Sequence, residues 1–173
     1  LFKFGFGFVE VGTITPKRQF GNPKPRVFRL EKDKALINRL GFNNDGSEIV
    51  SERLKKNIPE EFLGINIGPN KDTKDKVSDF LECFSKLNKF ASYITVNISS
   101  PNTVGLRDFH DEKLLSNLLN KLLELKKKIK TTCPIALKLS PDIGEKEISS
   151  INEMVLKFKI NGIILTNTTN QNR

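Results

Sequence analysis

Short apolar runs alternate with amphipathic segments along most of the chain. The runs, each four to six residues long and nearly continuous, lie at 6–11, 62–67, 93–98, 135–139 and 162–165. Runs of this kind are typical of parallel strands covered on both faces. Between them, apolar residues recur at helical spacing over 77–87, 115–125 and 148–158, and over a shorter segment at 47–56. The pattern predicts an α/β fold with a parallel sheet, and one domain over residues 1–173.

One segment departs from this alternation. Residues 26–30 form a short strand candidate after the proline-rich stretch 22–25, and residues 34–40 return beside it. This pattern predicts a β-hairpin inserted at about 22–42. Insertions between a strand and the next helix often carry functional residues.

Polar side chains stand at or just after the end of each predicted core strand. They are Thr13, Asn66, Asn97, Lys138 and Thr166. A doubly wound sheet concentrates its functional groups at one switch point, whereas a (β/α)₈ TIM barrel collects them from many strand ends at its carboxyl-terminal rim. The distribution favours the barrel.

The barrel is incomplete within these residues. A (β/α)₈ barrel has eight strands and typically about 250 residues, whereas five core strands are predicted in 173 residues. We therefore expect the chain to cover the middle of a barrel, with at least one strand preceding Leu1 and about two following Arg173.

Charge and composition exclude several classes of protein. The chain has 29 Lys and Arg against 20 Asp and Glu, for a net charge of +9, which could indicate nucleic acid or another anionic partner. The lysines are dispersed, however, and the densest run, 126–130, ends a predicted helix, where cations complement the helix dipole. We therefore expect no nucleic-acid binding.

Membrane-spanning and metal-binding classes are also disfavoured. No run of 18 apolar residues is present, so we expect these residues by themselves to be soluble. Cys83 and Cys133 are isolated, and His110 is the single histidine. We therefore expect no metal site, no disulfide scaffold and a reducing compartment. His110 lies in a charged segment and is predicted to be a solvated loop or helix start.

Lys138 is the first candidate for chemistry because it interrupts an apolar strand. A lysine there is costly unless its charge is used or reaches water. Either its stem packs while its head is solvated, or its ammonium faces an anion. The anion could be a phosphate, a carboxylate or the pyrimidine edge of a reduced flavin.

Four asparagines form the second candidate group: Asn66, Asn97, Asn102 and Asn167. Asparagine is a poor strand former, and each amide offers both a donor and an acceptor. Any one of them could cap a turn, but four at strand ends indicate a planar heterocycle with alternating N–H and C=O groups. The segment 99–103 directly follows a strand and is interpreted as an active-site loop.

Six segments, in this order and spacing, resemble the dihydroorotate dehydrogenase family. They are FGFVEVGTITP at 6–16, GNPKPR at 21–26, INRLGFN at 37–43, NISSPNT at 97–103, GLR at 105–107 and TNTT at 166–169. The resemblance implies a (β/α)₈ barrel that binds FMN at its rim and oxidises dihydroorotate to orotate in pyrimidine synthesis.

The resemblance also implies roles for individual residues. Ser100 stands where the quinone-reducing, membrane-associated class (class 2) has its catalytic base, with Thr103 and an ordered water as candidates for a proton relay. The implied FMN-binding residues are Thr13, Asn66, Asn97, Lys138 and Thr166. The implied substrate-binding residues are Asn38, Arg39, Leu40, Gly41, Phe42, Asn97, Asn102, Asn167 and Thr168.

The family's amphipathic segment, which forms the quinone entrance and contacts the membrane, is not among these residues. The resemblance implies a peripheral protein, on the cytoplasmic side of a bacterial inner membrane or at the mitochondrial inner membrane of a eukaryote. Two interpretations stay open. One is the flavoenzyme, and the other is a non-catalytic remnant or split-gene piece whose basic surface binds an anion or a partner.

Overall fold

Five parallel strands form the central sheet of the computed structural model, which describes residues 1–171. The strands lie side by side in chain order. They are β1 (Phe8–Ile14), β4 (Phe62–Ile67), β5 (Tyr93–Asn97), β6 (Ile135–Lys138) and β7 (Gly162–Ile164). All five predicted core strands are therefore confirmed, with ends that coincide or differ by at most three residues.

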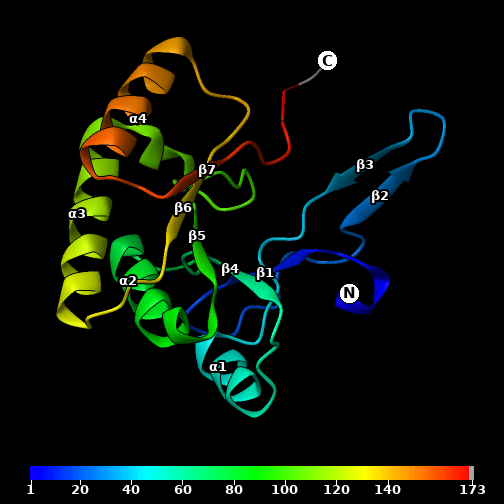
Figure 1. Ribbon diagram of the computed structural model, residues 1–173. Helices are drawn as coiled ribbons and strands as arrows, with labels where there is room; N and C mark the ends of the chain where they lie inside the picture. The colour runs from blue at the N-terminus through cyan, green and yellow to red at the C-terminus, as the bar shows by residue number, and fades with distance from the viewer. Residues whose placement is uncertain (172–173) are drawn as a thin grey trace.

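Four helices cover one face of this sheet. They are α1 (Ser47–Lys56), α2 (Lys76–Leu87), α3 (Glu112–Lys128) and α4 (Glu145–Lys157). Successive helices contact one another in chain order, so they form a single layer (Figure 1). A doubly wound sheet would reverse its strand order and have helices on both faces. The structure is therefore part of a (β/α) barrel, as predicted.

The two faces of the sheet differ in polarity more than the sequence suggests. In β5, Ile94 and Val96 are fully buried among the core residues beneath the helices, whereas Tyr93, Thr95 and Asn97 hydrogen-bond on the opposite face. The expectation of strands with apolar cover on both faces is wrong for this strand. Its inner face belongs to the barrel interior, where polar side chains make hydrogen bonds to one another.

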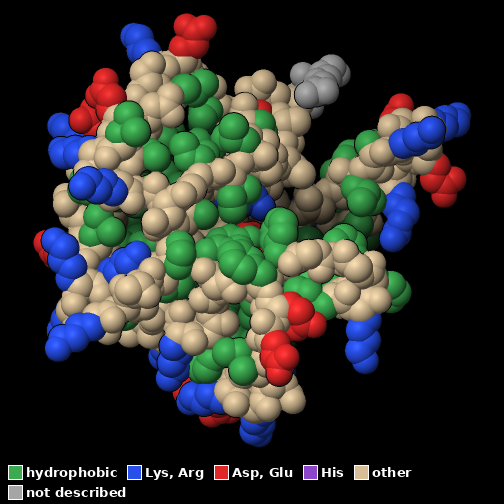
Figure 2. Space-filling model, in the orientation of Figure 1, with side chains coloured by type: hydrophobic (Ala, Val, Ile, Leu, Met, Phe, Trp, Pro, Cys, Tyr) green, Lys and Arg blue, Asp and Glu red, His purple; other side chains and the backbone are tan. Residues whose placement is uncertain are grey.

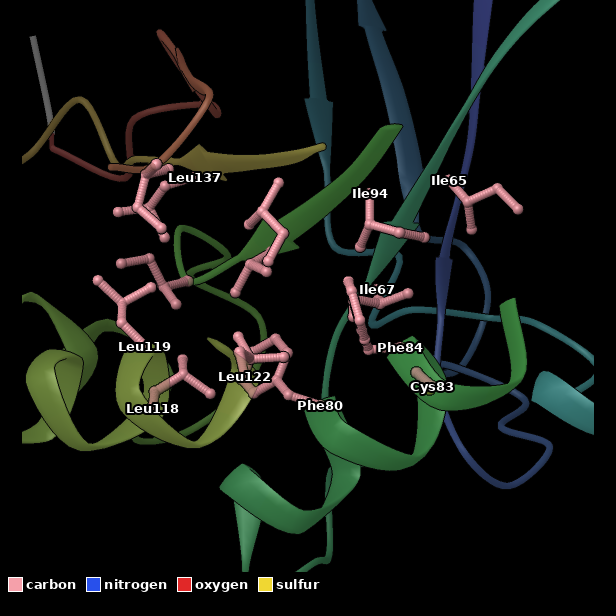
Figure 3. Packing of buried hydrophobic residues seen from close by; sticks show 14 of the residues in the cluster. Ile65, Ile67, Phe80, Cys83, Phe84, Ile94, Leu118, Leu119, Leu122 and Leu137 are labelled. Atoms are coloured by element: carbon pink, nitrogen blue, oxygen red, sulfur yellow. The ribbon is translucent and has the colours of Figure 1, made fainter. Parts of the chain in front are cut away.

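The hydrophobic core lies between the sheet and the helices. Ile65, Ile67 and Ile94 of the strands pack against Phe80 and Phe84 of α2, and all five are fully buried. Figure 3 shows these contacts together with the leucines that α3 contributes. Packing of this face fixes the strands, and so fixes where the side chains of the opposite face stand.

The inserted hairpin forms where it is predicted. Strands β2 (Val27–Leu30) and β3 (Ala35–Asn38) pair antiparallel in a separate two-stranded sheet, which extends away from the parallel sheet in Figure 1. The guanidinium of Arg26 anchors the base of the hairpin by donating to the carbonyl oxygens of Phe20 at 2.7 Å and Asn22 at 3.1 Å.

The prediction that His110 is solvated is wrong. Its side chain belongs to a 3₁₀ turn over Arg107–His110 and is only 6% exposed. Nδ1 lies 2.7 Å from the carbonyl oxygen of Arg107, and Nε2 is 3.4 Å from the backbone nitrogen of Ser140. The acidic neighbours suggested an exposed segment, but the turn directs the imidazole inward. Burial lowers the pKa of His110.

No helix within residues 1–171 combines the length and the apolar character needed to cross a bilayer. The same residues contain no group of three or more His, Cys, Asp or Glu side chains placed to hold a metal ion.

Candidate functional site

A cavity of about 450 Å³ opens at the carboxyl ends of the parallel strands. We call it the rim cavity; its size is within the range of small-molecule sites. Its lining residues come from β1, β4, β5, β6, the hairpin and the loops after β5 and β7. They are Glu10, Val11, Gly12, Thr13, Asn38, Leu40, Gly41, Phe42, Asn43, Asn66, Asn97, Ser100, Asn102, Lys138 and Asn167.

An irregularity in β1 positions Thr13. The pairing of β1 with β4 shifts register between Val11 and Ile14, and Gly12 has a φ of +131°. A β-carbon at residue 12 would lie 2.4 Å from the backbone oxygen of Asn66, so only glycine fits there. The shift directs the Thr13 hydroxyl at the Asn66 side chain, to which it donates at 2.7 Å.

Three amides and two hydroxyls join the strand ends into one network. The Asn97 Nδ2 group donates to Thr13 Oγ1 at 3.0 Å and to Asn66 Oδ1 at 3.2 Å. The Ser99 hydroxyl donates to Asn97 Oδ1 at 2.6 Å and accepts from Asn167 Nδ2 at 3.0 Å. The network therefore runs from β1 across β4 and β5 to the segment after β7.

Ser100 stands at the start of the loop after β5. Its side chain lines the rim cavity and is 3% exposed, and its oxygen accepts from the backbone nitrogen of Asn102 at 3.2 Å. This bond holds the hydroxyl in a fixed place. This part of the loop therefore forms an ordered part of the cavity wall.

Lys138 ends β6 and supplies the positive charge among the lining residues of the rim cavity. It pairs in register with Asn97 on the neighbouring strand, so the two side chains stand next to each other on the inner face. Lys138 is half-buried. A cation in this position can interact with negative charge that develops on a bound ligand.

The segment after β3 forms the side of the cavity nearest the hairpin. Gly41 has a φ of +71°, and its carbonyl oxygen accepts from Gln19 Nε2 at 2.9 Å. The amide of Asn44 then binds the carbonyl oxygen of Phe42 at 2.8 Å and the hydroxyl of Thr15 at 2.9 Å. These bonds fix the backbone of residues 40–42 beside the cavity.

Arg107 ties the loops around the rim together. Its guanidinium donates to the Ser99 carbonyl oxygen at 3.1 Å, to Asp142 Oδ2 at 2.9 Å and to Asn170 Oδ1 at 2.8 Å. The hydrogen bond from the Thr169 hydroxyl, followed by those from the backbone nitrogen of Asn170 and from Arg107, lowers the pKa of Asp142. Asp142 is therefore ionised when it accepts these bonds.

A second hollow of about 560 Å³ lies on the inner face near the amino ends of the strands. We call it the apolar hollow, because Phe8, Phe62, Ile135 and Ala136 line much of it. Figure 2 shows hydrophobic side chains gathered in the middle of the drawn face, over the strands. Fewer polar side chains line this hollow than line the rim cavity, which is therefore the candidate functional site.

Most of the site residues expected from the sequence meet in the rim cavity. Those that line it are Thr13, Asn38, Leu40, Gly41, Phe42, Asn66, Asn97, Ser100, Asn102, Lys138 and Asn167. Three expected residues are not among its lining residues. The Arg39 guanidinium donates to the Pro25 carbonyl oxygen at 2.8 Å, the Thr166 hydroxyl donates to the Asn167 carbonyl oxygen at 3.0 Å, and Thr168 is exposed.

The structure adds three residues to which the sequence interpretation gave no role: Glu10, Ser99 and Arg107. Ser99 and Arg107 act through the hydrogen bonds described above. Glu10 lines both the rim cavity and the apolar hollow. The sequence could have indicated Glu10, because its carboxylate interrupts the first apolar run as Lys138 interrupts a later one.

The fold and the cavity together define a (β/α)-barrel protein with a polar cavity at the carboxyl-terminal rim. The sequence profile described as dihydroorotate dehydrogenase matches residues 1–173. The chain belongs to the dihydroorotate dehydrogenase family.

Known proteins agree with this assignment. The chain is 49% identical over 173 residues to dihydroorotate dehydrogenase (quinone) of Bartonella tribocorum, with 98% of this chain and 48% of that protein covered. It is 50% identical over 171 residues to the protein of the same name from Acinetobacter baylyi, with 95% of this chain and 51% of that protein covered. The chain therefore spans about half the length of these curated relatives.

A solved structure gives the same result in three dimensions. The crystal structure of DHODH from Eimeria tenella in complex with ferulenol matches with a TM-score of 0.93 and 39% sequence identity. The match covers 99% of this chain and 52% of that one.

Proposed function

We propose that the protein containing this chain oxidises dihydroorotate to orotate in pyrimidine synthesis, with FMN as hydride acceptor and a quinone as final electron acceptor. One observation carries the proposal. Ser100, Lys138 and the amides of Asn66, Asn97 and Asn167 line a single cavity at the strand ends. The family assignment supports the same reaction.

The residues of the rim cavity fit FMN by their chemistry. The flavin pyrimidine ring carries C=O groups, to which the N–H of Asn66 that is not bonded to Glu10 could donate, while Thr13 and Asn97 hold the Asn66 amide in place. Lys138 would stand at the edge where negative charge gathers on reduction. Thr166 would contribute from the end of β7. When bound, FMN supplies the hydride acceptor.

Orotate would bind beside the flavin, against the hairpin side of the cavity. The candidate residues are Asn38, Arg39, Leu40, Gly41, Phe42, Asn97, Asn102, Asn167 and Thr168. Among them, Asn102 and Asn167 extend from different loops toward the same cavity, and the backbone of residues 40–42 is fixed by Gln19 and Asn44. Amide groups on two sides suit a flat ring that carries N–H, C=O and carboxylate groups.

Ser100 would act as the base that takes the proton from ring carbon C5 of dihydroorotate. A serine hydroxyl is a weak base, so this role needs a fixed geometry and a path for the proton. The hydrogen bond from the Asn102 backbone nitrogen supplies the fixed geometry. Thr103 is buried three residues further on, and it is a candidate for the relay together with an ordered water.

The quinone and the membrane belong to the same proposal. The relatives named dihydroorotate dehydrogenase (quinone) support the class 2 assignment. We infer peripheral contact with the inner membrane, bacterial or mitochondrial, through a segment outside these residues. Nucleic acid is not a partner in this proposal.

Turnover by the purified gene product that contains this chain tests the proposed function. We expect a yellow protein that forms orotate from dihydroorotate and reduces a soluble quinone analogue in equal amounts. A colourless protein that forms no orotate when supplied with FMN and quinone would overturn the proposal. That result would favour the alternative of a remnant or split-gene piece with a basic anion-binding or partner-binding surface.

A further inference from the structure

We propose that Glu10 is a positioning residue whose carboxylate holds the Asn66 amide at the end of the hydrogen-bond chain that crosses the rim cavity. The inference rests on the proposed function, because it concerns how the same site presents its amides to a ligand. Glu10 lies on β1, with its side chain between the rim cavity and the apolar hollow.

The chain of hydrogen bonds has a single direction and ends at Glu10. From the far side of the rim, Asn167 donates to Ser99, and Ser99 donates to Asn97. The amide of Asn97 then donates to the Thr13 hydroxyl, which donates to Asn66 Oδ1. The remaining step is from Asn66 Nδ2 to Glu10 Oε1 at 2.9 Å.

Groups at both ends fix the direction of this chain. The backbone N–H of Ser99, which can only donate, bonds Asn97 Oδ1 at 3.1 Å, and the Glu10 carboxylate accepts at the other end from Asn66. An ionised carboxylate can only accept, whereas an amide or a hydroxyl can both donate and accept. Because Glu10 accepts from Nδ2 of Asn66, the Oδ1 atom of that amide must face Thr13 and Asn97. Without the acceptor at residue 10, the Nδ2 group of Asn66 would lose its partner within the protein, and the side chain would be held only by the bonds from Thr13 and Asn97 to its Oδ1 atom.

Two further donors hold the Glu10 carboxylate in place. Its Oε2 atom accepts from the Thr95 hydroxyl at 2.7 Å and from the Tyr93 hydroxyl at 3.0 Å. Burial and the nearby Glu10 charge raise the pKa of Tyr93 to about 12, so its hydroxyl keeps the proton that it donates. Both carboxylate oxygens are therefore occupied by donors from three different side chains.

The backbone makes room for this arrangement. Gly64 lies between the two partners, since it pairs in register with Glu10 on one side and Tyr93 on the other. A β-carbon at residue 64 would lie 2.3 Å from Cζ of the Tyr93 ring and 2.5 Å from its hydroxyl oxygen. The absence of a side chain at Gly64 allows the tyrosine to reach across β4 to the carboxylate.

The direction of the chain decides what a ligand meets. In the observed direction, Oδ1 of Asn66 and Oδ1 of Asn97 are both engaged as acceptors, by Thr13 and by Ser99. The N–H groups of Asn66 and Asn167 that are not used within the chain remain for a ligand. The cavity therefore presents amide donors and the Lys138 ammonium, which suit the carbonyl oxygens of a flavin or a pyrimidine acid.

Replacement of Glu10 by methionine in the full gene product tests this inference. Methionine has a similar length but accepts only weakly, so Asn66 loses its acceptor. We expect the dissociation constant for FMN to rise by about tenfold or more, with a shifted visible absorbance spectrum of the residual bound flavin. Glu10→Gln keeps one acceptor oxygen, and should bind FMN within about threefold of the natural protein.

Thr95→Val is the matched control, because it removes a hydrogen bond to the same carboxylate and leaves the Asn66 contact in place. It should raise the dissociation constant for FMN by less than Glu10→Met does, because Tyr93 still donates to the carboxylate and Asn66 keeps its acceptor. FMN binding and an absorbance spectrum unchanged in Glu10→Met, or equal losses in Glu10→Met and Thr95→Val, would overturn the positioning role. If Glu10→Met does not fold, the triple variant with Tyr93→Phe and Thr95→Val also removes the two unpaired hydroxyls and gives the same test.

The two levels of the proposal can fail separately. If the natural protein binds no FMN, the proposed function fails. If the natural protein binds FMN and forms orotate while Glu10→Met matches it in affinity and spectrum, only the role of Glu10 fails.

Discussion

The guanidinium of Arg107 lies 2.9 Å from the carboxylate of Asp142, and this pair joins the loop after β5 to the loop after β6. The same guanidinium holds the carbonyl oxygen of Ser99, next to the proposed base. The side chains of the pair are 23% and 8% exposed, so water screens the pair less than it screens the Arg53–Asp45 pair on the surface.

Arg107→Lys should therefore slow turnover more than it lowers thermal stability. A lysine cannot hold Ser99, Asp142 and Asn170 at once, because it lacks the planar fork of donors. We expect kcat to fall by roughly tenfold to a hundredfold, as small misplacements of reacting groups do. Arg53→Lys is the matched control and should leave kcat unchanged. An Arg107→Lys variant with natural kcat would show that the pair does not position the loop.

Removal of the Ser100 hydroxyl should affect the chemical step. Ser100→Ala deletes the proposed proton acceptor, so the rate of flavin reduction by dihydroorotate should drop by roughly 10²-fold or more. Rapid mixing without oxygen measures that rate, and the visible absorbance of the flavin reports whether it stays bound. Ser149→Ala, which removes a serine hydroxyl that bonds only its own helix, should reduce flavin at the natural rate. Equal rates in the two variants would remove Ser100 from its role.

Loss of the Lys138 charge should make bound flavin harder to reduce. The ammonium lies beside Asn97 and would stabilise negative charge on the reduced ring. Lys138→Met should lower the two-electron potential by roughly 30 mV or more, which corresponds to about 1.4 kcal/mol. Equilibrium titration with a reference dye gives the potential. Lys128→Met, at the end of α3, is the control with the same change of net charge, and a shift as large in that variant would contradict a local effect.

Addition of a methyl group at Gly64 should destabilise the protein. The new β-carbon would overlap the Tyr93 ring, so either the ring or the strand must move. We expect Gly64→Ala to lower the free energy of unfolding by about 1–3 kcal/mol, as overpacking typically does. In Gly7→Ala the new β-carbon would meet no atom within 4 Å, so this control variant should change the free energy of unfolding little. Chemical denaturation of both variants makes the comparison, and equal stability would contradict the close approach of Tyr93 to β4.

The buried histidine predicts a loss of stability in weak acid. Burial lowers the pKa of His110 from its ordinary value of 6.5, so the unfolded chain takes up a proton before the folded protein does. The contribution of His110 is fully present above pH 6.5 and is lost as the pH falls from 6.5 through the lower folded value. Denaturation at a series of pH values from about 8 to about 5.5 measures this slope.

His110→Asn supplies the control for that slope. Its amide can still donate to the Arg107 carbonyl oxygen but does not titrate, so stability should depend less steeply on pH in this range. A slope equal to that of the natural protein would assign the effect to other groups.

Local sequence patterns predicted most of the fold. The helix over Ser47–Lys56 and the strand over Phe62–Ile67 form with the predicted ends, because each is bounded by turn residues and has a continuous pattern. The first strand differs, since Gly12 and Thr13 indicate a strand end while the backbone continues through them to Ile14. A register shift of this kind depends on the neighbouring strand, which a local pattern does not contain.

The candidate site was predictable only in part for a similar reason. Residues that break a pattern, such as Lys138 in an apolar strand, could be identified from the sequence. The burial of His110 could not, because it depends on Ser140, thirty residues further along the chain. Nor could the orientation of the Asn66 amide, which depends on the position of Glu10 on the neighbouring strand.

A crystal structure of the full gene product with FMN and orotate tests the central claim most directly. The account predicts the flavin ring in the rim cavity, with its pyrimidine edge against Lys138 and Asn97 and with orotate between the flavin and Asn167. A flavin ring bound in the apolar hollow between Phe8 and Phe62, or anywhere out of reach of Lys138, would contradict it.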